Sequence, residues 1–388
     1  MDIILYFFIA ILIIANTKLF AQLTLSITYN LKRKRQYNTA TLRISIIVPA
    51  YNEEKTIIST IQSLQKLVYP NYEIIVVDDG STDQTYQKAI LTQNSQTRII
   101  HQQNKGKPNA LNTGITQSSG DIILTVDADT TLHKDALTKI ANHFTSNPKI
   151  GAIAGNVKIK RELTFINTLQ SAEYATGINL VRKAQSVLGC VLVVPGPIAA
   201  IKKEAILKAG GFSEETFAED FDITLAILKA GYRIEYEETS IAYTDAPKNI
   251  QDLFKQRRRW YRGMIQVLDK YKNMYLNPKY GLAGTIGIPN LWLEATSPFI
   301  NLSLLLLILL TWAYTGEAYL TVMGLLVTVA VFLATNTVIL SLEPKPEKRN
   351  YLILPLLLFY NTFLDGIRIM SLTEETINIV MEWEKPKR

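Results

Sequence analysis

Two aspartates, Asp127 and Asp129, close an apolar run at residues 121–126 and are the first candidates for chemistry. Carboxylates are the ligands that a hard divalent cation prefers, and Mg²⁺ or Mn²⁺ is typically held by one or two of them together with phosphate oxygens. An Asp-X-Asp triplet alone is more often a solvated turn. Its position at the end of a predicted strand favours a metal site, with Mg²⁺ or Mn²⁺ as the cofactor.

Two further polar segments accompany the triplet. Residues 78–83 begin with Asp78-Asp79 and continue as a turn and helix N-cap, for which Asp, Ser and Thr are suited. Residues 105–112 begin a helix whose N-terminal dipole favours an anion. This segment does not match a phosphate-binding Walker A loop, so a nucleotide hydrolase is a poor interpretation.

Short β-branched runs that alternate with helices must position these residues. The predicted strands are 44–48, 73–77, 98–101 and 121–126, and the predicted helices are 54–67, a helix from Thr82, and 107–116. Such alternation predicts an α/β fold with a mostly parallel sheet. In these sheets ligands bind beyond the carboxyl ends of the strands. Polar residues fall at three of those ends, at 51–53 after the first strand, 78–79 after the second and 127–129 after the fourth, which favours one shared site.

Composition narrows the class of protein. The 388 residues carry a formal net charge of +7, and their basic residues gather beside apolar runs, at 32–35 and 345–349. A nucleic-acid binder would show a basic stripe with interleaved aromatic residues or a known module, so we predict no nucleic-acid partner. The single cysteine, Cys190, cannot build an intrachain disulfide or a cysteine cluster.

The first apolar run predicts a membrane anchor. Residues 3–20, extended to 25, are long enough to cross a bilayer core of about 30 Å. A secretory signal would carry its positive charge before the apolar run, whereas here the charge follows, at residues 32–35. The positive-inside tendency then puts the N-terminus outside and the next segment in the cytoplasm.

Apolar runs also fill the second half of the chain. Residues 291–314 and 319–342 predict two spans joined by a hairpin without basic residues, and the basic loop 343–349 suits the cytoplasm. Residues 351–364 are apolar for only 14 positions, so they fit a tilted span, a re-entrant segment or an interfacial helix. Lys385, Lys387 and Arg388 favour a cytoplasmic end and conflict with a fourth complete crossing.

Five motifs together resemble the family 2 glycosyltransferases. They are the segment 45–54, the segment 76–83, Lys105-Gly106-Lys107, the Asp-X-Asp pair, and residues 217–222 with Glu219-Asp220. In addition, Gln256 to Trp260 resembles the QxxRW signature of the membrane-bound synthase branch, which makes cellulose, chitin, hyaluronan and poly-N-acetylglucosamine. The resemblance covers roughly residues 43 to 270 and the arrangement of flanking spans.

The resemblance implies a GT-A fold, a nucleotide-diphosphate sugar donor, usually UDP, and inversion at the anomeric carbon. Asp220 would be the general base beside Glu219, and Asp127 and Asp129 would hold the metal and diphosphate. The remaining donor-site residues would be Tyr51, Glu53, Asp79 (on the uracil), Lys107, Gln256 and Arg259. Ala218 stands where the family commonly has Thr, which puts only a supporting contact in doubt.

On the acceptor side, the resemblance implies that Trp260 stacks on a sugar, with Gly196 and Pro197 nearby. Gln170, Glu173 and Tyr174 are further candidates for this wall. Arg257, Arg258 and Arg262 are better candidates for lipid or structural contacts, since the helix predicted at 250–271 mixes basic and apolar residues as membrane-surface helices do.

These observations predict five segments. They are an anchor at 1–28, a GT-A domain at 42–245 (a nucleotide-sugar half at 42–135 and an acceptor half at 136–245), interfacial helices with QxxRW at 246–290, a transmembrane cluster at 291–372, and a tail at 373–388.

The predicted function is inverting transfer of a sugar, with N-acetylglucosamine favoured, from a UDP-sugar to a growing polysaccharide. The enzyme would be a multi-pass plasma-membrane protein with a cytoplasmic catalytic domain that contacts lipids, and an accessory membrane subunit or homo-oligomer would complete a channel. Single-sugar transfer to a lipid acceptor is the alternative. A non-catalytic sugar-nucleotide binder fits poorly, because Asp79, Asp127, Asp129 and Asp220 are all present.

Overall fold

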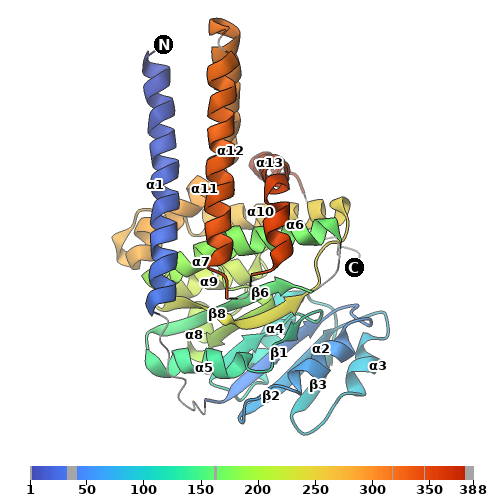
Figure 1. Ribbon diagram of the computed structural model, residues 1–388. Coiled ribbons are helices and arrows are strands. Elements are labelled where there is room, and N and C mark those ends of the chain that lie inside the picture. The colour runs from blue at the N-terminus through green and yellow to red at the C-terminus, as the bar shows by residue number, and fades with distance from the viewer. Residues whose placement is uncertain (1, 33–41, 161–163, 317, 345, 381–388) are drawn as a thin grey trace.

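A computed structural model describes residues 2–32, 42–160, 164–316, 318–344 and 346–380. The side chains of parts of three long helices, α1, α11 and α12, lie outside this description. One sheet of eight strands, in the order β3-β2-β1-β4-β7-β6-β8-β5, forms the centre of the α/β part, with helices on both faces (Figure 1).

The first half of the sheet confirms the predicted βαβ units. Its parallel strands are β1 (Ile44–Ala50), β2 (Tyr72–Asp79), β3 (Thr97–Gln102) and β4 (Ile122–Thr125). The connecting helices are α2 (Ile57–Leu64), α3 (Thr85–Ile90) and α4 (Lys107–Thr116). Because these strands are parallel, their carboxyl ends meet at one edge, where the polar segments were expected.

The second half makes the sheet mixed. Its strands are β5 (Thr131–Leu132), β6 (Ile150–Ile159), β7 (Ala199–Lys202) and β8 (Arg233–Thr244). β7 is antiparallel to both β4 and β6, whereas β6 and β8 are parallel. The helices are α5 (Ala136–Ser146), α6 (Phe165–Glu173), α7 (Asn179–Leu188), α8 (Lys203–Ala209) and α9 (Glu219–Lys229), with a π-helical turn at Tyr174–Ile178.

Strand β1 shows how the sheet separates two cores. Ile44, Ile46 and Val48 belong to a cluster that α2 and α5 cover, while Ile47 faces a second cluster containing residues of α4, α9 and α11. Alternate residues of a strand point to opposite faces, so a continuous apolar run is the expected sequence of a strand covered on both sides. This burial fixes the strand ends that carry the polar residues.

Five longer helices complete the chain: α1 (Asp2–Lys32), α10 (Ile250–Lys270), α11 (Ile288–Thr315), α12 (Ala318–Ser341) and α13 (Lys348–Thr376). Figure 1 shows α1 and α12 extending from the same side of the α/β part, well beyond it. Among the residues whose side chains the structure describes, α13 alone has the length and apolar content to cross a bilayer, and Leu326–Ser341 is a shorter apolar stretch.

The segment at 351–364, which the sequence left open, is part of α13. One stripe of this helix is buried, at Leu354, Leu357, Tyr360, Leu364 and Ile367, the three-to-four-residue spacing of a helix face packed on protein. Its polar end reaches α10, where Glu374 and Glu375 bond arginines. Helix α13 therefore packs against α10, the helix that carries QxxRW.

Candidate active site

Lys107 joins three segments of the chain at the carboxyl edge of the sheet. Its ammonium lies 2.7 Å from Asp127 Oδ1, just after β4, and 2.8 Å from Glu219 Oε1, at the start of α9. Burial opposes the charge on Lys107, but the two carboxylates outweigh it and raise its pKa. A permanent cation therefore stands between the predicted metal carboxylate and the predicted base segment.

Asp220 is half-buried beside this cation. Its Oδ2 accepts the backbone N–H of Gly196 at 3.2 Å, and its Oδ1 accepts the N–H of Phe221 at 2.8 Å. Burial and the neighbouring charge of Glu219 raise the pKa of Asp220, against the opposing effects of Lys107, the Gly196 N–H and Arg259. A raised pKa makes a carboxylate a stronger proton acceptor, as a general base requires.

Glu219 has the opposite electrostatic setting. Burial would raise its pKa, but Lys107 and Arg259 outweigh burial and lower it. Arg259 comes from α10 and donates from Nη1 to the carbonyl of Phe217 at 3.2 Å. The two adjacent acids therefore differ in pKa: nearby cations lower the pKa of Glu219, whereas the pKa of Asp220 is raised.

Gly196 allows a close approach at the same place. A Cβ at this position would lie 3.1 Å from Lys107 Nζ and 3.5 Å from both oxygens of Asp127. Its carbonyl accepts the Thr125 hydroxyl at 3.0 Å, and Pro197 follows in the same short 3₁₀ turn. The structure thus brings Gly196 to the Lys107 cluster, where a side chain would crowd the charged groups.

Asp79 fixes the loop that leads into α4. Its Oδ1 accepts the Lys105 N–H at 3.0 Å and the Gln102 amide at 2.7 Å, and its Oδ2 accepts the Gly106 N–H at 2.8 Å. The side chain is only 3% exposed. Its predicted contact with a nucleobase stays a prediction, and its visible role is to hold the turn that presents Lys107.

Tyr51 and Glu53 lie directly after β1, beside the loop that follows β2. Glu53 Oε2 accepts the Thr56 hydroxyl at 3.0 Å, and the Glu53 N–H donates to Thr85 Oγ1 at 2.7 Å. Between them Asn52 adopts a left-handed conformation, with φ of 53°, and its Oδ1 accepts the Thr82 N–H at 2.8 Å. Two strand ends are thus bonded together, with Tyr51 half-buried at their edge.

The two residues of the Asp-X-Asp pair differ in access. The Asp127 side chain is 26% exposed, whereas Asp129 is 1% exposed and its Oδ1 accepts the hydroxyls of Thr130 and Thr244, both at 3.2 Å. Among the described residues, no three His, Cys, Asp or Glu side chains gather closely enough to hold a metal. One accessible carboxylate nevertheless fits Mg²⁺ or Mn²⁺, which take further ligands from substrate phosphates and water.

The QxxRW residues lie on α10. Gln256 is 9% exposed, and its Oε1 has no hydrogen-bond partner among the described residues. Trp260 is half-buried with the Arg257 guanidinium 4.2 Å from its ring centroid, a cation–π distance. One face of Trp260 is therefore occupied by protein, and its predicted stacking on an acceptor sugar stays untested.

Arg257 bonds Glu173, which the resemblance made a candidate for the acceptor wall, and Glu173 in turn bonds Tyr360, which the sequence left unassigned. Arg257 is 1% exposed, and its Nη2 donates to Glu173 Oε2 at 2.7 Å. Tyr360 of α13 donates its hydroxyl to the same oxygen at 2.8 Å. Arg257 therefore has a structural contact, as expected, while Glu173 serves as its counter-ion and not visibly as part of an acceptor wall. The run of three arginines in the sequence indicated that acidic partners were needed, but not which residues they are.

The other two arginines pair with acidic residues of α13. Arg258 Nε donates to Glu374 and Arg262 Nε donates to Glu375, both at 2.7 Å. Among their described contacts both arginines have protein partners, which agrees with the structural alternative. Glu374 and Glu375 were not predicted as partners, and their one signal in the sequence is an acidic pair that follows a long apolar segment.

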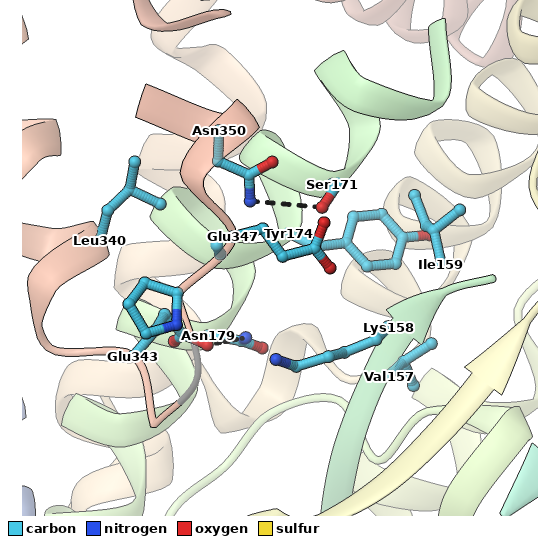
Figure 2. A pocket seen from close by; sticks show the side chains of 12 residues that line it. Val157, Lys158, Ile159, Ser171, Tyr174, Asn179, Leu340, Glu343, Glu347 and Asn350 are labelled. Atoms are coloured by element: carbon cyan, nitrogen blue, oxygen red, sulfur yellow. Dashed lines mark hydrogen bonds between the residues drawn. The ribbon is translucent and has the colours of Figure 1, made fainter. Parts of the chain in front are cut away.

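A small pocket lies away from the carboxylate cluster. It is lined by residues of β6, α6, α7 and the α12–α13 connection, and Figure 2 shows Lys158, Glu343 and Asn350 around it. Gln170, another wall candidate, is fully buried nearby and donates to the Pro247 carbonyl at 2.9 Å. The pocket volume of about 20 Å³ holds a water molecule, not a sugar. It therefore offers no alternative substrate site.

Comparison with known protein families agrees with a site at the carboxyl ends of the parallel strands. Residues 45–209 match the family model described as "Glycosyl transferase family 2". Over this segment the chain is similar to the family 2 glycosyltransferases. This confirms the predicted enzyme class, and the matched residues include Lys107, Asp127 and Gly196.

Curated relatives of this domain include polysaccharide synthases. The chain is 34% identical over 248 residues to the poly-beta-1,6-N-acetyl-D-glucosamine synthase of Staphylococcus aureus strain COL, covering 63% of this chain and 60% of the relative. It is 34% identical over 227 residues to the synthase of that name from Staphylococcus epidermidis, covering 58% and 55%. The similarity thus spans about three fifths of the relatives' length.

A solved structure confirms the GT-A fold. The mannosyltransferase of Pyrobaculum calidifontis, solved in complex with GDP-Man and Mn²⁺, superposes with a TM-score of 0.68 and covers 96% of this chain and 99% of that one. At 20% sequence identity this similarity supports the fold of the glycosyltransferase domain and not its substrate.

Proposed function

We propose that the protein is a metal-dependent, inverting glycosyltransferase that transfers N-acetylglucosamine from UDP-N-acetylglucosamine to a growing polysaccharide at the cytoplasmic face of a membrane. The observation that carries this proposal is the cluster of Lys107, Asp127 and Glu219 beside Asp220, whose pKa is raised. The synthases to which the chain is 34% identical support the choice of sugar and of a polymeric product.

In this proposal Asp220 is the general base. An acceptor hydroxyl is a weak nucleophile, so a carboxylate must take its proton as its oxygen attacks the anomeric carbon of the donor. The new bond joins that oxygen to the anomeric carbon, and the bond from the anomeric carbon to the diphosphate oxygen breaks. Attack opposite the leaving group inverts the anomeric centre. The Gly196 N–H, 3.2 Å from Asp220, holds the base in place.

The cations of the site stabilise the leaving diphosphate. Negative charge grows on its oxygen as the bond breaks, and Lys107 and Arg259 are positive groups already fixed beside the base segment. Asp127 is the accessible carboxylate suited to Mg²⁺ or Mn²⁺, which when bound supplies further positive charge to the diphosphate. The Mn²⁺ of the mannosyltransferase complex supports this cofactor class.

The nucleoside is placed at the carboxyl ends of β1 and β2, where parallel sheets bind ligands. Tyr51 and Glu53 line this edge, and Asp79 holds the loop before α4 whose N-terminus favours phosphate. Two strand ends bonded to each other offer a rigid floor for the donor.

The membrane arrangement supports synthesis at a bilayer. Helices α1 and α12 extend from one side of the catalytic domain (Figure 1), and their apolar sequences agree in position with the predicted spans. Helix α10 with Trp260 precedes α11, so the acceptor side would face that membrane. We therefore propose a multi-pass plasma-membrane enzyme that passes its product outwards, with a second copy or an accessory subunit completing the channel.

The test uses full-length protein in detergent with Mn²⁺ or Mg²⁺ and radiolabelled UDP-sugars. We expect high-molecular-weight product from UDP-N-acetylglucosamine, and its loss when a chelator is added. If label enters only the lipid phase, the result would contradict polymerisation and support single-sugar transfer to a lipid acceptor. Absence of transfer from every donor would contradict the enzymatic proposal.

An Asp→Asn change outside the site provides a matched control for the same change at Asp220. Asp220→Asn should lower kcat at least about 1,000-fold, because it removes the proton acceptor. Asp121→Asn changes an exposed residue at the opposite, amino end of β4 and should leave activity unchanged. Retained activity in Asp220→Asn would assign the base elsewhere.

A further inference from the structure

The backbone of Phe217, just before the catalytic acids, is held on both sides by α10. Its N–H donates to Gln266 Oε1 at 3.0 Å, and its carbonyl accepts from Arg259 Nη1 at 3.2 Å. Residues 259 and 266 are two helical turns apart and share one face of the helix. The peptide that leads into Glu219 and Asp220 is therefore clamped by one face of α10.

A glycine lets the two segments approach this closely. Gly263 lies between Arg259 and Gln266, and a Cβ there would be 2.7 Å from the Ala218 Cβ and 2.9 Å from the Ala218 nitrogen. Such distances exclude any larger residue without a shift of the backbone. The small residue at 218, where the family commonly has Thr, fits the same close packing.

Glu375 fixes the orientation of the Gln266 carboxamide. Gln266 Nε2 donates to Glu375 Oε1 at 2.9 Å, which leaves Gln266 Oε1 free to accept the Phe217 N–H. The other oxygen of Glu375 accepts from Arg262 Nε at 2.7 Å, and the Arg262 side chain is only 4% exposed. The Glu375 carboxylate of α13 therefore fixes the orientation of two side chains of α10, Gln266 and Arg262.

The end of α13 is itself well ordered by backbone bonds. Asn378 is left-handed, with φ of 55°, the Ile379 N–H donates to the Glu374 carbonyl, and the Asn378 N–H donates to the Glu375 carbonyl. This is the bond pattern of a Schellman C-cap. It turns the Ile379 carbonyl towards Arg262, which donates to it from Nη2 at 2.6 Å.

We propose that Glu375 is a positioning residue for sugar transfer: through Gln266 it holds the Phe217 peptide, and so sets the place of Asp220. This inference rests on the proposed function, in which Asp220 is the base. It links the far end of α13, more than 100 residues away in sequence, to the reacting carboxylate. A base displaced by about 1 Å can lose about 100-fold in rate.

The chemistry requires a carboxylate at this position. Both groups that face Glu375 are N–H donors, one from Gln266 and one from Arg262. Glutamine offers one acceptor and one donor, so Glu375→Gln must leave a donor facing a donor. The easiest relief is a flip of the Gln266 amide, which would then present its NH₂ group to the Phe217 N–H and break that bond.

The test compares Glu375→Gln with Glu374→Gln in the full-length protein. Glu374 is the preceding residue and also pairs with α10, through Arg258 Nε at 2.7 Å and Arg262 Nη1 at 3.6 Å, whereas the described hydrogen bond of Gln266 Nε2 goes to Glu375. We expect Glu375→Gln to lower kcat about 10- to 100-fold with donor KM within about threefold of wild type. Glu374→Gln should keep kcat within about threefold. Gln266→Leu should reproduce the loss, and the double variant should be no worse than either single one.

Hydrogen exchange gives a second reading that needs no turnover. In Glu375→Gln the peptide that contains Phe217 should exchange about tenfold faster, and in Glu374→Gln it should match wild type. Equal losses in both variants would reduce Glu375 to a stabilising residue. Unchanged kcat and exchange in Glu375→Gln would overturn the proposal. If wild type transfers no sugar, the proposed function fails while the exchange comparison still decides whether Glu375 holds the loop.

Discussion

The donor-side loops and the QxxRW helix are held in place by different kinds of contact. On the donor side, Asp79 accepts backbone N–H groups of Lys105 and Gly106, and Asn52 accepts the N–H of Thr82, all from residues within about 30 positions in sequence. On the other side, ion pairs such as Arg257–Glu173 and Arg262–Glu375 join residues 84 and 113 positions apart.

This difference has a consequence for function. In each of the bonds on the proposed donor side one partner is a backbone N–H, which most substitutions keep, so only a change at the accepting side chain of Asp79 or Asn52 removes the bond. The QxxRW helix depends on ion pairs in which two arginines are almost fully buried, Arg257 at 1% and Arg262 at 3% exposed. Removing one partner of a buried pair is strongly destabilising. We therefore expect the acceptor side to be the more sensitive of the two to single substitutions.

The residue at which the two sides meet should show the largest effect. Lys107 contacts Asp127 of the proposed donor half and Glu219 of the proposed acceptor half. Lys107→Met removes the cation that stabilises the leaving group and leaves two carboxylates without their partner. We expect kcat/KM to fall about 1,000-fold, equivalent to about 4 kcal/mol. Lys107→Arg, measured alongside, should recover part of the loss, and a loss below about tenfold would contradict the central role of this cation.

The next largest effect should be a difference between the two regions in how much one substitution lowers the free energy of unfolding. Glu173→Gln leaves the buried Arg257 without its counter-ion, and we expect the free energy of unfolding to fall by about 3 kcal/mol. Thermal unfolding of the purified protein measures this change.

The matched donor-side change is Glu54→Gln. Glu54 is about one third exposed and lies 3.6 Å from Lys88, so we expect a loss below about 1 kcal/mol. Comparable destabilisation by the two variants would remove the proposed distinction between the two sides.

A smaller effect is expected from Asp79→Asn, which weakens the donor side from within. The asparagine keeps one acceptor but turns an NH₂ group towards one of the loop amides. We expect about 1–3 kcal/mol of lost stability and a donor KM raised about tenfold, since the loop before Lys107 loosens. Kinetics at saturating and limiting donor measure the change. A lowered kcat with unchanged KM would instead point to a role in the transfer step.

The contrast also explains what the sequence could predict. The strand ends near Asp79 and Asp127 were predictable because a buried apolar run and the turn after it are neighbours in the chain. The partners of Arg257 and Arg262 were not, because an ion pair depends on where helices meet in space and leaves no local pattern. The mixed direction of the sheet was missed for the same reason: the residues of β7 do not reveal that it runs antiparallel to β4 and β6.

The pH dependence of transfer gives the smallest and sharpest test, because it reads the charge beside the base directly. Asp220 must be ionised to accept a proton, and burial followed by the charge of Glu219 raises its pKa. Activity should therefore be present above that pKa and be lost as the pH falls through it. Glu219→Gln removes the neighbouring negative charge, so the Asp220 pKa should fall and the acid limb of kcat/KM should move to lower pH, even as the maximum rate drops with the loss of a Lys107 partner. Glu54→Gln, on the donor side and away from the base, should leave the limb in place. If the acid limb does not move in Glu219→Gln, another group accepts the proton. Asp220 would then not be the base, and the buried contacts of α10 and α13 would have no catalytic residue to position.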